Sequence, residues 1–478
     1  MKILYITSEA VPFASSGGLG DVMGALPEAV NAQSRNIETS VIMPLYNSVK
    51  EEYRKNFEKY ADLSFKLAWR NTGASVFKTE LGGVSYYFVE NSYYFDRNNL
   101  YGEFDDGERF AFFGIAVVEF MLQNNFFPDV IHANDWQCAL PIIYLKTKYR
   151  NNADLNKIKC VYTIHNIEYQ GKYDLAILGD VFALDNDYLG IVEYDGCINL
   201  MKGALLSADY VTTVSENYSR ELEYDYFAHG LARIIEVVKY KFKGIINGID
   251  YSRYSPTTDN YISFNYSAKA YKLAKSKNKK ALQSELNLKI DDKVPLLAMV
   301  TRLADAKGIE LVIHILEELL SENIQLVILG TGEKRYENKL IEIAKRHENF
   351  RAEIRFDRIL SQKIYAAADM FIMPSKSEPC GLAQIISLSY GTIPIVRRVG
   401  GLYDTIIPYG KENYLGFTFD NYNAHELLNA IKIALGVYKN DKEEWNRLIK
   451  RAMNTRYDWD KSAKEYVEIY KKITGNEI

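Results

Sequence analysis

The stretch KILYITSEAVPFASSGGLGDV, residues 2–22, sets the pattern for this sequence. Its first part, Lys2–Thr7, is a short apolar run that predicts a buried strand, and the glycine-rich loop Ser16–Asp21 then leads into a helical segment. Glycines in such a loop let backbone N–H groups approach a phosphate or a sugar, and a helix N-terminus favours an anion. A plain tight turn would look the same, so the motif alone does not identify a ligand.

The same alternation of a short apolar run and a longer amphipathic segment continues along the chain. Helix-like segments such as Phe110–Gln123 and Ile309–Leu320 lie between runs rich in Val, Ile and Tyr. This alternation predicts parallel sheets covered by helices, and Lys78–Glu90, with two central glycines, predicts a hairpin insertion. The predicted strands are Lys2–Thr7, Thr39–Met43, Asp129–His132, Val161–His165, Tyr210–Val214, Leu296–Val300, Leu326–Leu329, Ile354–Phe356, Met370–Met373 and Ile393–Val396.

The two series of strands are separated by Asn247–Lys293, which holds a polar stretch and a lysine-rich helix. We therefore expect a first domain of residues 1–248 and a second of residues 249–455, with residues 456–478 as a C-terminal helix that packs back on the first. The predicted fold class is α/β, with two doubly wound Rossmann-like domains facing each other across a cleft. In such sheets ligands bind at the carboxyl ends of strands.

Composition narrows the functional classes. A chain of 478 residues is too long for one hydrophobic core, and 47% apolar with 25% charged residues is typical of a soluble protein. A net charge of −4 argues against a nucleic-acid binder. The four cysteines form no CxxC pair, which indicates a reducing compartment and no zinc site. The first apolar run is too short for a signal peptide and no stretch is long enough to span a membrane, so we expect a cytoplasmic protein.

Charged residues follow two strands of the second series. Arg302 and Lys307 lie on one loop, where two cations could hold a departing diphosphate, although a pair of solvated surface charges is the alternative. Glu378 lies in Pro374–Leu382, before a helix whose N-terminus could hold phosphate, which would place its carboxylate near a sugar. The alternative for Glu378 is a first-turn acid that interacts only with the helix dipole.

Other candidate motifs are weak when taken singly. His165-Asn166, Asp135-Trp136 and Asn247-Gly248 follow strands, but a lone histidine, an N-cap aspartate and an Asn-Gly turn are usually structural. Asp185-Asn186-Asp187 matches a metal-binding DxD pattern, which is frequent by chance, and we interpret it as a surface loop.

Neither glycine loop has the nicotinamide-cofactor fingerprint GxGxxG. Met23 stands where the third glycine of the first loop would fall, and Arg335 takes that place after Gly330-Thr331-Gly332. An oxidoreductase is therefore a distant alternative.

Together these segments resemble the bacterial glycogen synthase and plant starch synthase family, which comprises retaining glycosyltransferases of the GT-B fold (glycosyltransferase family 5). The motifs follow in family order over nearly the whole chain. They are Ser8-Glu9, Gly17–Val22, Asp135-Trp136, His165-Asn166, Asn247–Asp250, Arg302 with Lys307-Gly308, Glu378–Leu382, Gly400–Leu402, and the closing Trp459, Ser462-Ala463 and Tyr466.

The resemblance implies transfer of glucose from ADP-glucose to the non-reducing 4-OH of an α-1,4-glucan such as glycogen, with retention of configuration. It implies that Glu378 supports the positive charge on the transferred glucose, that Arg302 and Lys307 bind the diphosphate, and that His165 contacts the glucose. The implied donor-binding residues are Ser15, Gly17, Gly18, Asn247, Phe356, Gly381 and Leu382, with backbone amides at the glycines completing a phosphate cradle. The implied acceptor- or sugar-binding residues are Glu9, Asp21, Phe95, Asp135 and Trp136. No metal or other cofactor, no nucleic acid and no membrane partner is expected.

The sequence departs from the family pattern at the donor loop. Ser15 stands where the family has a lysine that contacts the donor, and Ala383 replaces a threonine beside the phosphate cradle. Phe95 and Phe356 replace tyrosines, which keeps their rings but removes two hydroxyl groups. These differences leave two alternatives open: the same fold with UDP-glucose or another acceptor, and a non-catalytic glucan-binding paralogue.

Overall fold

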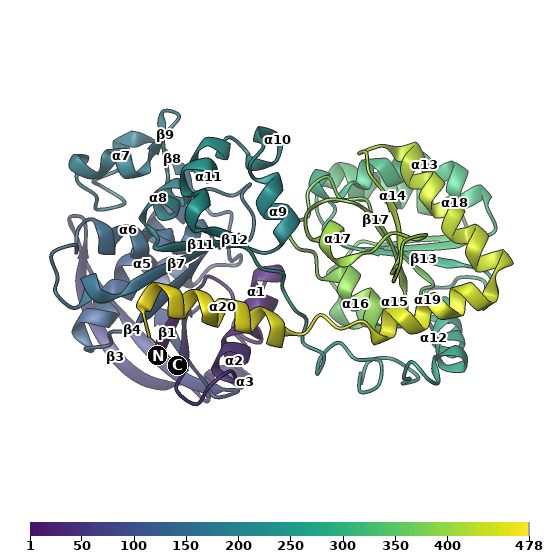
Figure 1. The fold of residues 1–478 in the computed structure, drawn as a ribbon, viewed down its shortest axis with the longest axis horizontal. Coiled ribbons are helices and arrows are strands. Elements are labelled where there is room, and N and C mark those ends of the chain that lie inside the picture. Colours follow the sequence, from purple (N-terminus) through teal and green to yellow (C-terminus); the bar gives the residue numbers. More distant parts are fainter. Residues whose placement is uncertain (477–478) are drawn as a thin grey trace. The chain divides into compact units, whose positions relative to one another are not determined.

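The chain folds as two α/β units, seen in a computed structural model that describes residues 1–476 (Figure 1). The first unit comprises Met1–Gly248 together with the C-terminal segment from Trp459, and the second comprises Ile249–Asp458. Each unit has its own sheet. None of the helices in the described residues is long and apolar enough to cross a bilayer.

The first unit is built on a nine-stranded sheet in the order β12-β11-β7-β6-β1-β2-β5-β4-β3. Neighbouring strands are parallel from β12 to β5, and β4 and β3 are added antiparallel at one edge. The strands are β1 (Lys2–Ile6), β2 (Glu38–Pro44), β3 (Glu58–Leu67), β4 (Arg70–Leu81), β5 (Val84–Glu90), β6 (Val130–Asn134), β7 (Lys159–Ile164), β11 (Tyr210–Thr213) and β12 (Phe242–Gly244). The predicted hairpin is present as β4–β5, and its two-residue turn needs glycines because Gly82 and Gly83 have φ of +59° and +74°.

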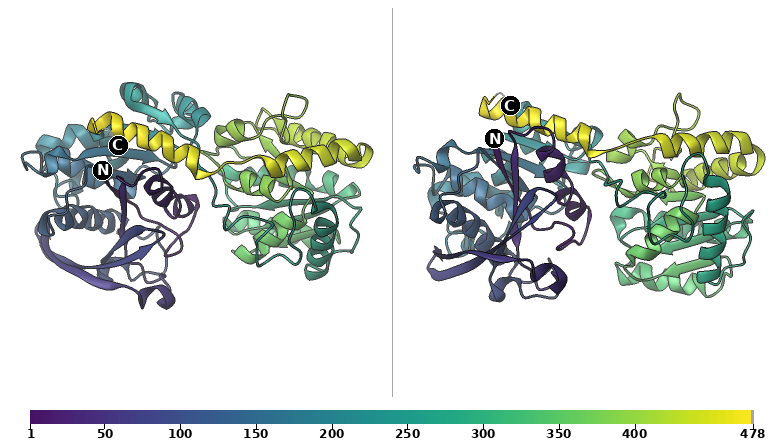
Figure 2. Two further views of the ribbon diagram at one scale, coloured as in Figure 1. Left: turned by 60° about the horizontal axis from the view of Figure 1, so that its bottom comes forward. Right: turned by 90° about the horizontal axis from the view of Figure 1, so that it is seen from below.

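Helices cover the first sheet, and α5 is buried on all its sides, which explains its nearly continuous apolar sequence. The C-terminal helix α20 belongs to this unit and packs on α2, as the views in Figures 1 and 2 agree. The helices are α1 (Gly18–Met23), α2 (Leu26–Asn31), α3 (Glu51–Arg54), α4 (Ser92–Phe95), α5 (Asp106–Gln123), α6 (Ala139–Lys146), α7 (Leu189–Val192), α8 (Leu200–Ser207), α9 (Glu216–Glu221), α10 (Asp225–Ala228), α11 (Ala232–Val238) and α20 (Trp459–Thr474). A small antiparallel sheet is formed by β8 (Lys172–Tyr173), β10 (Cys197–Asn199) and β9 (Glu193–Tyr194).

The second unit has a six-stranded parallel sheet in the order β15-β14-β13-β16-β17-β18. This is the 3-2-1-4-5-6 order of a doubly wound Rossmann sheet, and β5-β2-β1-β6-β7-β11 of the first unit follow the same order. The strands are β13 (Leu296–Val300), β14 (Gln325–Leu329), β15 (Phe350–Glu353), β16 (Met370–Met373), β17 (Ile393–Arg397) and β18 (Phe417–Phe419). The predicted fold class, two doubly wound α/β domains, is confirmed for each sheet.

One predicted strand was misplaced. Ile354–Phe356 is a loop, and the strand is β15, four residues earlier. Because β15 lies at the sheet edge and pairs only with β14, its sequence, FRAE, is half polar and gives little apolar signal. The helices of this unit, which Figure 2 shows on both faces of the sheet, are α12 (Tyr271–Glu285), α13 (Ile309–Ser321), α14 (Lys334–Ala344), α15 (Arg358–Ala367), α16 (Ala383–Ser389), α17 (Gly400–Thr405), α18 (Ala424–Asn440) and α19 (Lys442–Asn454).

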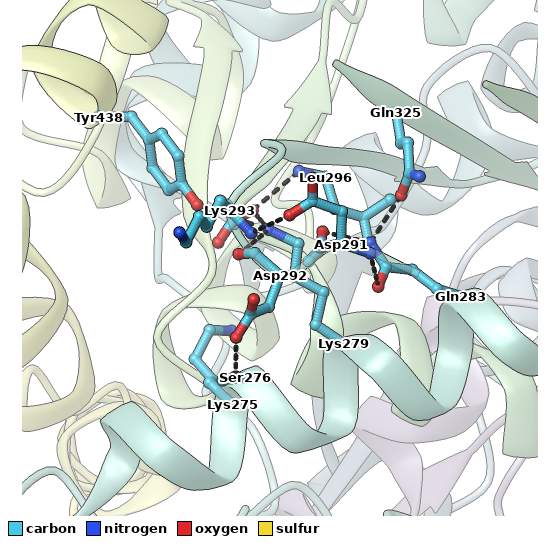
Figure 3. A network of polar contacts seen from close by, with 12 residues as sticks. Lys275, Ser276, Lys279, Gln283, Asp291, Asp292, Lys293, Leu296, Gln325 and Tyr438 are labelled. Atoms are coloured by element: carbon cyan, nitrogen blue, oxygen red, sulfur yellow. Dashed lines mark hydrogen bonds and ion pairs between the residues drawn. The ribbon is translucent and has the colours of Figure 1, made fainter. Parts of the chain in front are cut away.

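The lysine-rich helix α12 is attached to the amino ends of the strands by buried polar contacts (Figure 3). Lys275 Nζ donates to Thr392 Oγ1 at 2.8 Å and to the carbonyls of Tyr390 and Ala366 at 3.2 and 3.3 Å. Lys279 Nζ lies 2.6 Å from the carboxylate of Asp369. These lysines therefore act as structural groups at the sheet edge opposite the carboxyl ends of the strands.

Candidate active site

In the first unit, the carboxylate of Glu9 organises the glycine-rich loop. Glu9 is buried directly after β1, where it accepts hydrogen bonds from Ser16 N at 2.5 Å, Ser16 Oγ at 2.7 Å and Gly17 N at 3.2 Å. In this structure the Gly17 amide is therefore bound to a carboxylate, whereas the sequence predicts that it donates to phosphate. Glu9 holds the loop in place, and its predicted contact with a sugar stays a prediction.

Ser15 and Gly18 are exposed on this loop, and Asp21 is half-buried in the first turn of α1. The Ser15 hydroxyl donates to the carbonyl of Gly17 at 3.1 Å. The side chain of Ser15 also lies against Gly20, where an added Cβ would come within 2.3 Å of the Ser15 Oγ. Gly20 is thus needed for the close packing of this loop.

Tyr101 is a functional candidate that sequence reasoning missed. Its hydroxyl lies 2.7 Å from both the Glu9 carboxylate and Ser8 Oγ, so it reaches the carboxyl end of β1 from a loop far along the chain. Burial and the charge of Glu9 raise the pKa of Tyr101 well above its ordinary value, so it stays protonated and donates to Glu9. Its position between Leu100 and Gly102 gave no signal for this role.

His165 and Asp135 come together because they follow the neighbouring strands β7 and β6. Asp135 Oδ1 accepts hydrogen bonds from the amides of His165 at 2.8 Å and Asn166 at 3.3 Å. Asp135 itself has φ +55° and ψ 178°, a combination that an L-residue rarely adopts and that the surrounding contacts must maintain. This strained turn places the Asp135 carboxylate within hydrogen-bonding distance of the backbone amides of His165 and Asn166.

Burial controls the charge of both groups. It lowers the pKa of His165 to about 3, so the imidazole is neutral at pH 7. The His165 Nε2 lies 2.8 Å from Asn134 Oδ1, which can only accept, so Nε2 carries the proton. Burial raises the pKa of Asp135 to about 7, an effect that the two backbone N–H donors partly oppose.

Two of the predicted sugar-binding rings lie in the core. Phe95 is fully buried and packs on Tyr46 and Phe112, so the prediction that it contacts a sugar is not supported by its position. Trp136 is only 8% exposed and packs edge-on against Phe110 with 5.3 Å between ring centroids. Both rings are therefore core residues, as is usual for an aromatic side chain in an apolar context.

Asn247 follows β12 and is also buried. Its Oδ1 has no hydrogen-bond partner among the described residues. A buried amide oxygen without a partner is costly, so this atom is available to a donor from a ligand or a water.

In the second unit, Lys307 and Glu378 form a paired group. Lys307 Nζ lies 2.8 and 2.7 Å from the two carboxylate oxygens of Glu378, and the buried Ser375 donates from Oγ to Oε2 at 2.9 Å. Glu378 is 6% exposed, whereas Arg302 on the same loop as Lys307 is exposed to solvent. The sequence had predicted all three charged residues, but not the role of Ser375 in orienting the carboxylate.

Glycines allow the loops that carry these residues to pack backbone against backbone. At Gly308, with φ +69°, an added Cβ would lie 2.1 Å from the carbonyl oxygen of Pro374. At Gly400, with φ +46°, it would lie 1.9 Å from the carbonyl oxygen of Glu378, which accepts a hydrogen bond from Gly401 N at 3.0 Å. The motif at 400–402 thus supports the backbone of the catalytic candidate.

The remaining donor-binding candidates lie on two other loops of the second unit. Gly381 has φ +69° and, with Leu382, lies immediately before α16, while Phe356 is 87% exposed on the loop after β15. An exposed ring at the carboxyl end of a strand is available to stack on a nucleobase.

The predicted DxD loop is exposed and starts the short 3-10 helix Asn186–Tyr188. Across residues 1–476 no group of three or more His, Cys, Asp or Glu side chains is arranged to hold a metal ion.

Comparisons with known proteins identify the family. Residues 2–237 match the starch synthase catalytic domain, and residues 283–455 match glycosyl transferases group 1. The chain is 44% identical to the glycogen synthase of Clostridium beijerinckii over 485 aligned residues, which cover 100% of both chains. The chain belongs to the glycogen synthase family. The glycogen synthase of Alkaliphilus metalliredigens, at 42% identity over 99% of this chain and 100% of its own, is similarly related.

Solved structures agree with this membership. The catalytic domain of starch synthase IV from Arabidopsis thaliana, bound to ADP and acarbose, superposes with a TM-score of 0.92 at 31% identity over 99% of both chains. Sucrose-phosphate synthase from Thermosynechococcus elongatus has a TM-score of 0.62 at 17% identity over 99% of both chains, which shows a shared fold only. The predicted family, the GT-B fold class and the glucosyltransferase class of enzyme are therefore confirmed.

Proposed function

We propose that this member of the glycogen synthase family transfers glucose from ADP-glucose to the non-reducing 4-OH of an α-1,4-glucan, with retention of configuration. The observation that carries the proposal is the Lys307–Glu378–Ser375 group at the carboxyl ends of β13 and β16, which joins a cation for phosphate to a fixed carboxylate for the sugar.

In the proposed reaction the bond between the glucose C1 and the diphosphate oxygen breaks, and the acceptor O4 forms its bond to C1 on the same face. The proton of the acceptor hydroxyl passes to the departing phosphate oxygen, so that ADP leaves as the other product. Arg302 and Lys307 stabilise the growing negative charge of the diphosphate, and Glu378 stabilises the positive charge of the sugar ring.

The Lys307–Glu378 ion pair gives this reaction a charge switch. Without donor, Lys307 neutralises Glu378. A bound diphosphate competes for the ammonium group, because a phosphate carries more charge than a carboxylate. As Lys307 turns toward phosphate, the carboxylate of Glu378 is left to attract the cationic sugar.

In this proposal the first unit contributes an uncharged side chain that contacts a sugar. His165 is uncharged, so it can contact glucose hydroxyl groups without opposing the positive charge that develops at C1. Asp135 fixes the backbone on which His165 lies.

We propose that the enzyme needs no metal or other cofactor, since Arg302 and Lys307 supply the positive charge that a divalent ion would provide. Activity that persists in EDTA would support this. We also propose a cytoplasmic location from cysteine usage, because Cys138 and Cys160 are buried thiols outside any disulfide.

Ser15 favours a second candidate, the same reaction with UDP-glucose, because the family lysine that contacts the donor is absent. The test is donor-dependent elongation of glycogen with each nucleotide sugar, followed as release of ADP or UDP. We expect turnover with ADP-glucose that is lost in Glu378→Gln. Turnover with UDP-glucose alone would reject the donor assignment, and no transfer from either donor would favour a non-catalytic glucan-binding protein.

A further inference from the structure

The loop between α4 and α5, residues 96–105, is held firmly at its base. The fully buried Arg109 donates to the carbonyls of Tyr94 at 2.8 Å and Leu100 at 3.3 Å, and it pairs with Asp106 at 2.5 Å. Asp106 in turn accepts from Gly102 N at 2.7 Å. These contacts fix the backbone on both sides of the loop, so its tip has a defined conformation.

The same loop reaches the proposed sugar site through Tyr101. The hydroxyl of Tyr101 bridges Ser8 and Glu9 at the carboxyl end of β1. Three residues of extended chain span at most about 11 Å, so the backbone of Phe104 lies within that distance of Tyr101. Phe104 therefore lies on the same fixed loop as Tyr101, three positions further along the chain.

Phe104 is fully exposed, at 106% of the reference area for the residue. On a mobile loop a large apolar side chain can rotate into the protein interior. Contacts of Arg109, Asp106 and Tyr101 fix the backbone of this loop, so Phe104 stays exposed. The ring is thus held in solvent on the loop whose Tyr101 contacts Glu9. An aromatic ring in such a place provides a flat apolar surface that a ligand can cover.

We propose that Phe104 is an acceptor-binding residue whose ring stacks on a glucose unit of the α-glucan chain. The inference rests on the proposed function. The apolar face of a pyranose ring matches an aromatic face, and the chain of the acceptor extends beyond the reacting sugar.

The charges of the loop favour the neutral acceptor over the anionic donor. Arg97 is paired with Asp105 at 2.8 Å and Arg109 with Asp106, so both arginines of residues 96–109 already hold carboxylates. Glu103 adds a further negative charge next to Phe104. A diphosphate is repelled by these groups, whereas a glucan carries no charge and its hydroxyl groups can donate to carboxylates.

The test compares Phe104→Ala with the wild type in steady-state kinetics at saturating ADP-glucose, with maltoheptaose as the acceptor. We expect the KM for maltoheptaose to rise about five- to tenfold, as befits the loss of one aromatic contact. The kcat at saturating acceptor and the KM for ADP-glucose should stay within about twofold, since the ring lies outside the reacting groups. Phe104→Trp should restore the acceptor KM.

A matched control is Tyr240→Ala, which removes another ring of the same unit that is 81% exposed. Because both side chains are exposed, neither variant should unfold the protein. If Phe104→Ala raises the acceptor KM no more than Tyr240→Ala does, or raises the donor KM instead, the proposal is wrong.

Direct binding of maltoheptaose, measured by titration without any donor, separates this proposal from the proposed function. Weaker binding by Phe104→Ala than by Tyr240→Ala would support the stacking role even if the wild type transferred no glucose. Equal binding by both variants in an active enzyme would overturn the stacking role alone.

Discussion

The buried lysine of α12 makes the stability of the second unit depend on pH. Lys275 lies in a shell of two carbonyls and one hydroxyl, and burial lowers its pKa to about 7 from an ordinary value near 10.5. Asp369 raises this pKa and Lys279 lowers it further, but neither offsets the loss of hydration. The charged form of Lys275 is thus disfavoured in the folded protein.

The sign of the effect follows from proton binding. Between pH 7 and pH 10.5 the unfolded chain keeps the Lys275 proton while the folded chain releases it. The free energy of unfolding therefore rises with pH over this interval, at up to about 1.4 kcal/mol per pH unit. From pH 7 to pH 9 the gain is about 2 kcal/mol, because at pH 7 half of the folded molecules are still protonated.

The assay is thermal unfolding of the wild type and of Lys275→Met between pH 6.5 and pH 9. A gain of about 2 kcal/mol corresponds to a rise of about 4–8 °C in the Tm of a unit of this size. Lys275→Met keeps the aliphatic volume and removes the titrating group. Between pH 7 and pH 9 the Tm of this variant should therefore rise about 4–8 °C less than the Tm of the wild type. Equal pH dependence in the two proteins would refute the reasoning, since every other titrating group is shared.

Three further predictions concern the site. Ser15→Lys should bind ADP-glucose at least as tightly as the wild type, with a KM lower by up to about tenfold, because it restores a charged contact to phosphate; a higher KM would show that the loop is built differently. Gly400→Ala should lower kcat by at least about tenfold, since the new Cβ would lie 1.9 Å from the carbonyl oxygen of Glu378. The control is Gly436→Ala, which should leave kcat unchanged because no atom lies within 4 Å of the new Cβ. Because the pKa of Asp135 is about 7, kcat/KM should increase as pH rises from 6 to 8 and its carboxylate forms, and a pH–rate profile of Asp135→Asn should lack this inflection.

Parts of the fold with a strong local signal could be predicted from the sequence. The buried parallel strands are continuous apolar runs, so their order along the chain and the Rossmann class followed from them. The edge strands were harder to predict from the sequence. β15 was placed four residues late because it is half polar, and β3 was missed although Leu63, Phe65 and Leu67 alternate along it.

The site was predictable where the chemistry lies in the residue type and unpredictable where it lies in contacts. Lys307 and Glu378 were singled out from their positions after two strands, but the ion pair between them was not predicted. The sequence could not reveal that Tyr101 reaches Glu9 across 92 positions. It also could not distinguish the core ring of Phe95 from the exposed ring of Phe104, because burial depends on tertiary packing.

The proposed charge switch at Lys307 would account for the close pairing of this lysine with the carboxylate of Glu378. The pair is partly buried and hydrogen-bonded to Ser375, which limits the cost of removing both charges from water. Breaking it by substitution of one partner leaves the other charge unpaired. Variants of this pair should therefore be judged by catalysis and by stability together.

The most direct test of the central claim is transfer of glucose from ADP-glucose to glycogen by the wild type and by Glu378→Gln. Gln keeps the shape of the side chain but removes the negative charge that we propose stabilises the sugar cation. We predict a fall in kcat of about 10²–10³ with ADP-glucose binding retained, and a lower Tm because Lys307 loses its charged partner. A kcat within about tenfold of the wild type would contradict the account.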